Sequence, residues 1–262
     1  MPMRNRCETS RLILEDASIP YTFEVIGWNP WIEGVKSEYP RLGKLPVLKG
    51  EGLDYELGNE QSIVRYLAKK HGYAGSSLVE ESRYDEYYQQ FWTTLRNNGL
   101  THDGDSYSPS SLVGIEKREC PSYGEIRRLN DEGVVGRSLA ALKVFEDALK
   151  ESGTGFIVGE KISYVDLAVF YCLIELTEED MVPDFAERFG LTELGKFIER
   201  MLKREKIRDY IFSERRMPRY KRPGYTFCSS YGSNTFNELL GSVEVTGQEL
   251  SDGWKARTQE MK

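Results

Sequence analysis

Apolar and polar residues follow two different periods along this chain, and the change from one to the other divides it. Tyr21 to Ile26 (YTFEVI) alternates apolar and polar residues, the period-two pattern of a strand. Glu8 to Ala17 before it has apolar residues at helical spacing, and Pro20 prevents that helix from continuing. The chain therefore opens with a helix followed by a strand.

A second mixed segment follows. Val47-Leu48 and Leu53 to Leu57 are two short apolar runs joined by a glycine-containing turn, which predicts an antiparallel pair. The next stretch, Asn59 to Gly75, is predicted to be an amphipathic helix closed by Gly72. One face of that helix is apolar: Ile63, Val64, Leu67 and Ala68.

Beyond Gly75 the periodicity is helical only. A first helix has an aromatic stripe at three- and four-residue steps: Tyr84, Tyr87, Tyr88, Phe91, Trp92 and Leu95. A second carries Val135, Leu139, Leu142, Phe145 and Leu149. The long polar stretch between them, 99–133, is an insertion of the length that is usually functional or disordered.

A capping box marks the next helix. Ser163 precedes the apolar run Leu167 to Leu176, and Asp166 stands three residues after the serine, so the two can cap the helix reciprocally. Leu194 to Ile211 predicts a final helix. We therefore expect an α/β domain at 1–75, an all-α domain at 76–216 containing the insertion 99–133, and a loosely ordered tail at 217–262.

Composition removes several classes of function. A net charge of −7 disfavours broad attraction to nucleic acid, and the alternating charges of Lys196 to Arg222 predict a solvated helix face. No apolar run reaches the roughly 20 residues of a membrane span, and the N-terminus lacks the apolar core of a secretory signal. We expect a cytoplasmic protein whose scattered cysteines are reduced, without a metal site: Cys7, Cys120, Cys172 and Cys228.

Three segments together carry a family resemblance. RNRCETSRLILEDASIPYTFEVI (Arg4 to Ile26), GKLPVL (Gly43 to Leu48) and GFIVGEKISYVDLAVF (Gly155 to Phe170) occur in this order. The chain from Arg4 to Ser213 resembles cytosolic glutathione transferases, nearest to the pi, mu and sigma classes. The resemblance implies a thioredoxin-like domain, then a helical domain, usually in a homodimer. It implies glutathione as co-substrate, no bound cofactor, and an apolar electrophile in the cleft between the domains.

The resemblance also implies where glutathione would bind. Leu45-Pro46 matches the family's cis-proline turn, which would offer the Leu45 backbone to the cysteinyl part of glutathione as a strand edge. Arg6 would lie near the γ-glutamyl end. The glycine carboxylate would meet Trp31, Lys36 and Lys44. Packing for Trp31 and simple solvation for the two lysines remain the structural alternatives.

Further positions follow by the same comparison. Asn59 and Glu60 fall where the family holds the γ-glutamyl α-carboxylate and amine, and Glu60 puts a carboxylate where a hydroxyl is expected. A shifted register would place Gln61-Ser62 there instead. For the co-substrate cleft we expect an apolar wall from Tyr87, Tyr88 and Phe91, although core packing accounts for most of that stripe equally simply.

One part of the family pattern is missing from the sequence as it stands. The compared classes begin with a strand whose tyrosine hydroxyl favours the glutathione thiolate, and by the spacing from Trp31 that tyrosine would fall just before Met1. Three explanations stay open: a start further upstream, a variant without the usual chemistry, or replacement by another residue. The candidate replacement is Cys7, whose pKa the helix N-terminus and the nearby Arg4 and Arg6 would lower.

Two functions remain in competition. The first is a glutathione transferase-like enzyme that joins glutathione to an electrophilic, aromatic small molecule. Its N-terminal sequence also resembles that of transferase-like proteins of fungal secondary-metabolite pathways. The second is a non-catalytic glutathione-binding or structural protein on the same fold. The absent tyrosine and Glu60 favour the second.

Overall fold

The structure is a computed structural model, and it describes residues 7–26, 31, 33–39, 42–50, 52–95, 131–177, 184–213, 216 and 240–245. The chain divides into two compact units. Unit 1 holds residues 1–71, 203–223 and 228–262, and unit 2 holds 72–202 and 224–227. The first boundary lies four residues before the predicted one, and the chain returns to unit 1 before the predicted helical domain ends.

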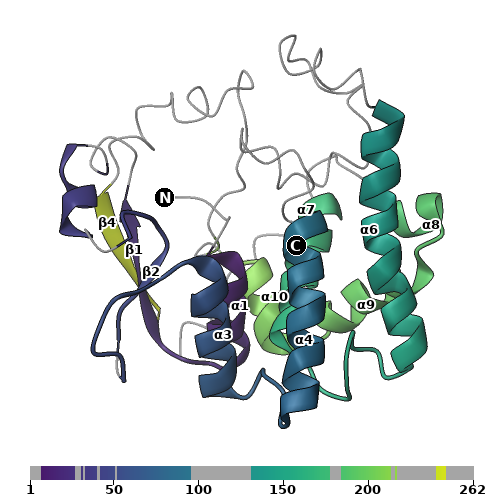
Figure 1. Ribbon diagram of the computed structural model, residues 1–262, viewed down its shortest axis with the longest axis horizontal. Helices are drawn as coiled ribbons and strands as arrows, with labels where there is room; N and C mark the ends of the chain where they lie inside the picture. The colour runs from purple at the N-terminus through teal and green to yellow at the C-terminus, as the bar shows by residue number, and fades with distance from the viewer. Residues whose placement is uncertain are drawn as a thin grey trace, which may run out of the picture. The chain divides into compact units, whose positions relative to one another are not determined.

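Unit 1 is a small mixed unit (Figure 1). Its helices are α1 (Glu8–Asp16), the 3₁₀ turn η1 (Val35–Glu38), α3 (Glu60–His71) and α10 (Glu205–Ile211). Its strands are β1 (Tyr21–Ile26), β2 (Val47–Leu48), β3 (Leu57–Gly58) and β4 (Leu240–Val245). Helix α1 packs against both α3 and α10. The predicted first helix and first strand are confirmed.

The strands of unit 1 form two separate antiparallel pairs. β1 pairs with β4, with Tyr21 opposite Val245 and Ile26 opposite Leu240. β2 pairs with β3, with Val47 opposite Gly58. The predicted second strand of this hairpin, Leu53 to Leu57, is wrong for most of its length. A turn bond from the Leu53 N–H to the Gly50 carbonyl, at 3.1 Å, keeps the chain out of the ladder until Leu57.

Strand β4 corrects the expectation of a loosely ordered tail. Leu240–Val245 lies within 217–262 and supplies all six residues of the β1 partner. Its period is weak in sequence because glycine and serine interrupt it, and only the pairing with β1 identifies it as a strand. Apart from 240–245, the predicted tail lies outside the described residues.

Unit 2 is helical among its described residues. Its elements are α4 (Leu78–Gln90), the π-helical turn η2 (Phe91–Leu95), α6 (Asp131–Ser152), α7 (Tyr164–Thr177), α8 (Phe185–Phe189) and α9 (Thr192–Leu202). α7 forms the centre, with Val165 and Phe170 fully buried, and it packs on α4 and α9. The predicted insertion 99–133 is outside the described residues except for its last three, which belong to α6.

The predicted final helix is two helices. α9 ends at Leu202, and α10 begins at Glu205. Arg204 between them is extended (φ −72°, ψ 113°) and holds Asp16 of α1 in a two-pronged ion pair, Nε to Oδ1 at 2.9 Å and Nη2 to Oδ2 at 2.6 Å. The break between α9 and α10 accompanies the ion pair with Asp16, which is 188 residues from Arg204 in the sequence. Local periodicity does not reveal such a distant partner.

The N-terminus of α9 is capped from another helix. Glu146 of α6 is 2% exposed and accepts the N–H groups of Glu193 (3.1 Å) and Leu194 (2.9 Å). Such N–H groups have no partner inside their own helix, and the helix dipole favours a carboxylate there.

We predict that Glu146→Ala lowers the free energy of unfolding by about 1–3 kcal/mol, because two orphaned N–H groups lose their acceptor. Urea denaturation followed by circular dichroism measures the loss. The neighbouring Asp147 is exposed, so Asp147→Ala should change stability by less than about 0.5 kcal/mol. Equal losses in the two variants would contradict the capping role.

Candidate functional site

The Leu45-Pro46 step is the most specific feature of unit 1. Its peptide bond is cis, as the resemblance implies, and it leads directly into β2. Both residues are half-buried, and Leu45 packs against a small core cluster made by Ile26, Trp31 and Tyr39. Among the described residues, no loop hydrogen bond uses the backbone of Leu45. Its N–H and C=O are thus available to an extended ligand lying beside this turn.

Trp31 is held by packing. It is 7% exposed, and its ring lies 6.1 Å from that of Tyr39. Trp31 therefore packs in the core, as the alternative interpretation of this residue expected. A contact between its indole N–H and a ligand stays a prediction. Tyr39 also makes a cation–π contact, because the Lys49 Nζ lies over its ring, 4.7 Å from the ring centroid. Sequence reasoning missed this cation–π contact because its partners are separated by the whole cis-proline turn.

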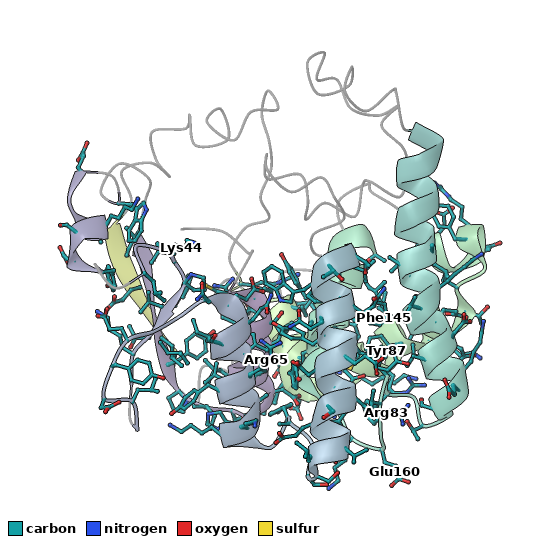
Figure 2. The ribbon with its side chains drawn as sticks, in the orientation of Figure 1. Lys44, Arg65, Arg83, Tyr87, Phe145 and Glu160 are labelled. Carbon is teal, nitrogen blue, oxygen red and sulfur yellow. The ribbon has the colours of Figure 1, made fainter. Side chains whose placement is uncertain are left out.

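Lys36 and Lys44 are both exposed. Lys36 lies in η1, and its Cε would lie 3.5 Å from a Cβ placed on Gly43, so its stem runs beside the cis-proline loop. Lys44, labelled in Figure 2, is the residue immediately before the cis-bonded pair Leu45-Pro46. The structure therefore brings two ammonium-bearing side chains to one loop, where they are free of core packing.

The N-terminus of α3 supplies the other predicted pair. Asn59 has a left-handed backbone (φ 68°) and is exposed, and its carbonyl accepts the Ile63 N–H at 3.0 Å in the first turn. Asparagine tolerates this conformation better than most residues. Glu60 is 3% exposed, at the helix end where the dipole favours an anion. Gln61 and Ser62 lie in the same turn, so the shifted register stays open.

A cavity is lined by some of the predicted site residues. It measures about 520 Å³, lies entirely within unit 1, and is lined by Cys7, Leu45 and Pro46 among others. Trp31, Lys36, Lys44, Asn59 and Glu60 do not line it. Arg6 is outside the described residues.

The comparisons with known proteins agree with one another. A model described as the glutathione S-transferase C-terminal domain matches residues 136–214. A probable glutathione S-transferase 9 of Caenorhabditis elegans is 28% identical over 68% of this chain and 78% of its own length. The glutathione S-transferase P 1 of Xenopus laevis is 27% identical over 83% of this chain and 92% of its own.

A solved structure gives the same answer. The glutathione S-transferase from Ascaris lumbricoides has a TM-score of 0.64 and 25% identity over 80% of this chain and 93% of that one. The chain is thus similar to cytosolic glutathione S-transferases in sequence and in fold. Its fold is accordingly the thioredoxin-like unit followed by a helical unit that the resemblance implied.

The likeness to glutathione transferases makes the state of Cys7 informative. The thiol stands at the start of α1, where a lowered pKa was expected. Instead, burial raises the pKa of Cys7, the Arg11 guanidinium only partly opposes this, and the Glu60 and Glu8 carboxylates raise it further. The expectation failed because it counted the cations and the helix end but not the burial of the thiol, which has the largest effect, or the two carboxylates. Cys7 is therefore a neutral thiol at neutral pH.

The three aromatic residues expected to line a co-substrate cleft have unequal exposure. Tyr88 and Phe91 are fully buried in unit 2, their rings stack 6.0 Å apart, and Tyr88 meets Tyr164 edge-on at 5.0 Å. Tyr87 is partly exposed and points toward Phe145 of α6, with the ring centroids 6.1 Å apart (Figure 2). Of the three, Tyr87 keeps surface for a ligand, and the other two belong to the core.

Two further observations bear on the class of site. In the part of the chain that the structure describes, no helix combines the length and apolar character required to cross a bilayer. Over the same residues, side chains of the metal-binding types do not gather in groups of three or more.

Proposed function

We propose that this chain binds glutathione in unit 1 and transfers it to an electrophilic small molecule. The cis Leu45-Pro46 turn carries the proposal, because it presents a backbone edge beside two exposed cations and the N-terminus of α3. The Leu45 backbone would pair with the cysteinyl part of glutathione. Lys36 and Lys44 would meet its glycine carboxylate, and the first turn of α3 would face the γ-glutamyl end.

The proposed reaction needs the thiolate of glutathione as nucleophile. Its sulfur forms a bond to an electrophilic carbon, a leaving group such as halide departs with the bonding electrons, and the thiol proton passes to solvent. The neutral thiol of Cys7 is a poor candidate for assisting this proton loss, since burial and two carboxylates raise its pKa. We therefore leave Cys7 out of the proposed chemistry.

The proposal has finer parts. We infer a cytoplasmic homodimer that acts on an apolar, aromatic electrophile, with Tyr87 as part of the wall it meets. A role in fungal secondary metabolism is supported by the N-terminal resemblance. Sedimentation velocity tests the dimer: a single species at the mass of one chain would contradict it.

A non-catalytic glutathione-binding or structural protein on the same fold is the second candidate. Glu60 favours its structural form, because a buried carboxylate at the γ-glutamyl end would repel the α-carboxylate of glutathione. The raised pKa of Cys7 favours it too, since that thiol does not supply the missing activation.

Titration calorimetry with glutathione and turnover of 1-chloro-2,4-dinitrobenzene separate the candidates. Binding with turnover supports the transferase, binding without turnover supports the second candidate, and failure of both overturns the site.

We predict that Lys44→Ala weakens glutathione binding roughly three- to tenfold, about 1 kcal/mol, because the ligand carboxylate loses its ion pair with an exposed ammonium group. Calorimetry measures the change. Lys143→Ala on the exposed face of α6 is the matched control and should leave binding unchanged. Trp31→Phe keeps the ring in the core cluster but removes the indole N–H, so unaltered binding in this variant would remove Trp31 from the site.

A further inference from the structure

Tyr39 anchors the loop that carries Lys36 and Lys44. It is only 8% exposed, and its backbone holds the loop at two points. The Tyr39 N–H donates to the Lys36 carbonyl at 3.2 Å, and the Tyr39 carbonyl accepts the Gly43 N–H at 2.9 Å. Gly43 immediately precedes Lys44. A displacement of Tyr39 would therefore move the backbone at both lysines.

The Tyr39 side chain is fixed at its ring and at its hydroxyl. The Trp31 ring lies 6.1 Å from the Tyr39 ring, and the Lys49 Nζ lies 4.7 Å from the Tyr39 ring centroid. Lys49 Nζ also donates a hydrogen bond to the Tyr39 hydroxyl oxygen at 3.2 Å. In the part of the chain that the structure describes, no other side chain bonds that hydroxyl. The position of the hydroxyl therefore depends on Lys49.

Glu56 orients Lys49 in turn. Lys49 directly follows β2 and Glu56 directly precedes β3, so the two residues occupy the next position of the paired strands. Their ion pair joins Lys49 Nζ to Glu56 Oε1 at 3.2 Å, and the side chains are 52% and 39% exposed. A pair this exposed adds little to the stability of the hairpin. Its effect is geometric, because it holds the Lys49 ammonium at the Tyr39 hydroxyl.

These contacts form one line that spans the cis-proline turn, from Glu56 through Lys49 to Tyr39. The line ends at the loop of Lys36 and Lys44, the two exposed ammonium groups that would meet a glycine carboxylate. A ligand that recruits long side chains from a loose loop pays for ordering both the side chains and the loop. A loop that is fixed beforehand reduces this entropic cost, so the anchor should strengthen binding of the carboxylate.

We propose that Lys49 is a positioning residue that makes this site selective for thiol ligands ending in a free carboxylate. Through the Tyr39 hydroxyl it fixes the loop, and the loop holds Lys36 and Lys44 where the terminal carboxylate binds. Lys49 itself does not touch the ligand. This inference rests on the proposed glutathione site, and it adds a determinant of selectivity outside the groups that would contact glutathione.

Titration calorimetry with two ligands tests the selectivity in the full chain. Glutathione has a free glycine carboxylate, whereas its glycyl ethyl ester has none. We expect wild type to bind glutathione roughly tenfold more tightly than the ester. Lys49→Met should weaken glutathione binding about three- to tenfold and ester binding less than about twofold, because only the carboxylate uses the fixed loop.

Lys70→Met is the matched control for Lys49→Met. It also removes an exposed ammonium that lies near a tyrosine ring of unit 1, with Lys70 Nζ 5.7 Å from the Tyr66 ring centroid. Lys70 is at the C-terminal end of α3, whereas the proposed site uses the N-terminal end. This variant should bind both ligands like wild type.

A further variant distinguishes positioning from direct contact. Tyr39→Phe keeps the ring beside Trp31 and removes only the hydroxyl, so it should weaken glutathione several-fold and leave the ester little changed. The double variant Lys49→Met/Tyr39→Phe should bind no more weakly than Lys49→Met, because both changes act through one bond. If Lys49 met the ligand directly, Tyr39→Phe would bind glutathione normally, and that result would overturn the positioning role.

The remaining outcomes separate this inference from the proposed function. If wild type binds glutathione and the ester equally, or if Lys49→Met weakens both equally or neither, the positioning role is overturned while glutathione binding stands. If wild type binds neither ligand, the glutathione site itself is overturned, and the role of Lys49 with it.

Discussion

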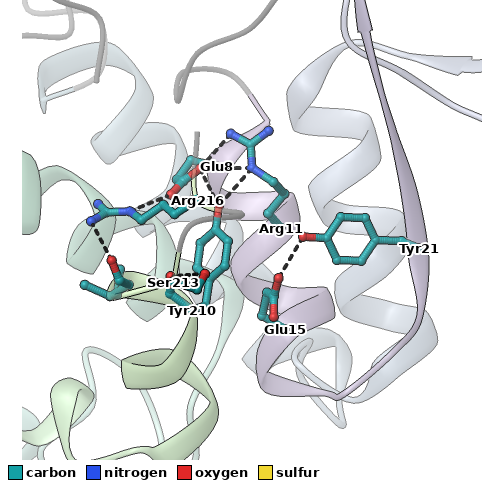
Figure 3. A network of polar contacts seen from close by, with 8 residues as sticks. Glu8, Arg11, Glu15, Tyr21, Tyr210, Ser213 and Arg216 are labelled. Atoms are coloured by element: carbon teal, nitrogen blue, oxygen red, sulfur yellow. Dashed lines mark hydrogen bonds and ion pairs between the residues drawn. The ribbon is translucent and has the colours of Figure 1, made fainter. Parts of the chain in front are cut away.

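Glu8→Ala is expected to lower the free energy of unfolding of unit 1 by about 3–5 kcal/mol, because it leaves buried guanidinium groups without their carboxylate. Glu8 is fully buried and accepts from Arg11 Nη2 at 2.6 Å and from Arg216 Nε at 3.3 Å. Tyr210 of α10 completes the network, donating to Glu8 Oε2 at 3.1 Å (Figure 3). Burial and the Glu8 carboxylate raise the pKa of Tyr210, which keeps its hydroxyl a donor.

Hydrogen exchange in α1 and α10 measures the loss, and two variants calibrate it. Tyr210→Phe removes one hydroxyl from the network and should cost about 1–2 kcal/mol. Glu56→Ala removes the partner of Lys49 from an exposed ion pair, and should cost less than about 1 kcal/mol. A Glu8→Ala protein no less stable than the Glu56→Ala protein would show that the buried network does not hold α10 to α1.

Asp166→Ala is expected to cost unit 2 a similar amount, about 3–5 kcal/mol, because a single buried carboxylate satisfies several groups. Its Oδ2 accepts the Ser163 N–H (2.8 Å) and hydroxyl (2.6 Å), and its Oδ1 accepts the Ile157 N–H (2.8 Å). The predicted capping box is thus confirmed, and it also fixes the loop before α7. The exposed cap of α4 is the control: Ser77→Ala should cost only about 1 kcal/mol. Urea denaturation compares the two.

The same carboxylate gives a pH dependence. Burial raises the pKa of Asp166 from its ordinary 3.8 to about 6, although its hydrogen bonds favour the charged form. Between about pH 4 and pH 6 the folded state therefore binds more protons than the unfolded state, and this contribution to stability falls as the pH rises. Asp166→Asn does not titrate. The advantage of wild type over this variant should be up to about 3 kcal/mol greater near pH 4 than near pH 7, and a constant difference would contradict the raised pKa.

Local patterns predicted the elements that depend on local interactions. The alternation of Tyr21 to Ile26, the Ser163–Asp166 cap and the glycine that ends α3 each act within a few residues, and each is present. The Leu45-Pro46 turn was found through the resemblance, which carries information about tertiary context that periodicity lacks. The proposed glutathione site lies at the Leu45-Pro46 turn and the N-terminus of α3.

The remaining features depend on partners far along the chain. The break at Arg204 requires Asp16, and the identity of β4 requires β1. The pKa of Cys7 is raised first by burial of the thiol and further by Glu60, which is remote in sequence. A sequence pattern records which residues are present but not which of them meet, so helix ends, cations and carboxylates were weighed without their burial.

The return of the chain to unit 1 has a consequence for the order of synthesis. Residues 204–216 supply Arg204, Tyr210 and Arg216, the partners of Asp16, Glu8 and Arg11 in α1. On the ribosome the N-terminal segment is made first, yet it waits for these partners until nearly all of unit 2 has emerged. Unit 2 can close its core before unit 1 does. A fragment ending at residue 75 would keep the Glu8–Arg11 ion pair but would lack Arg204, Tyr210 and Arg216. The part of this protein that is translated first is therefore the part that finishes folding last.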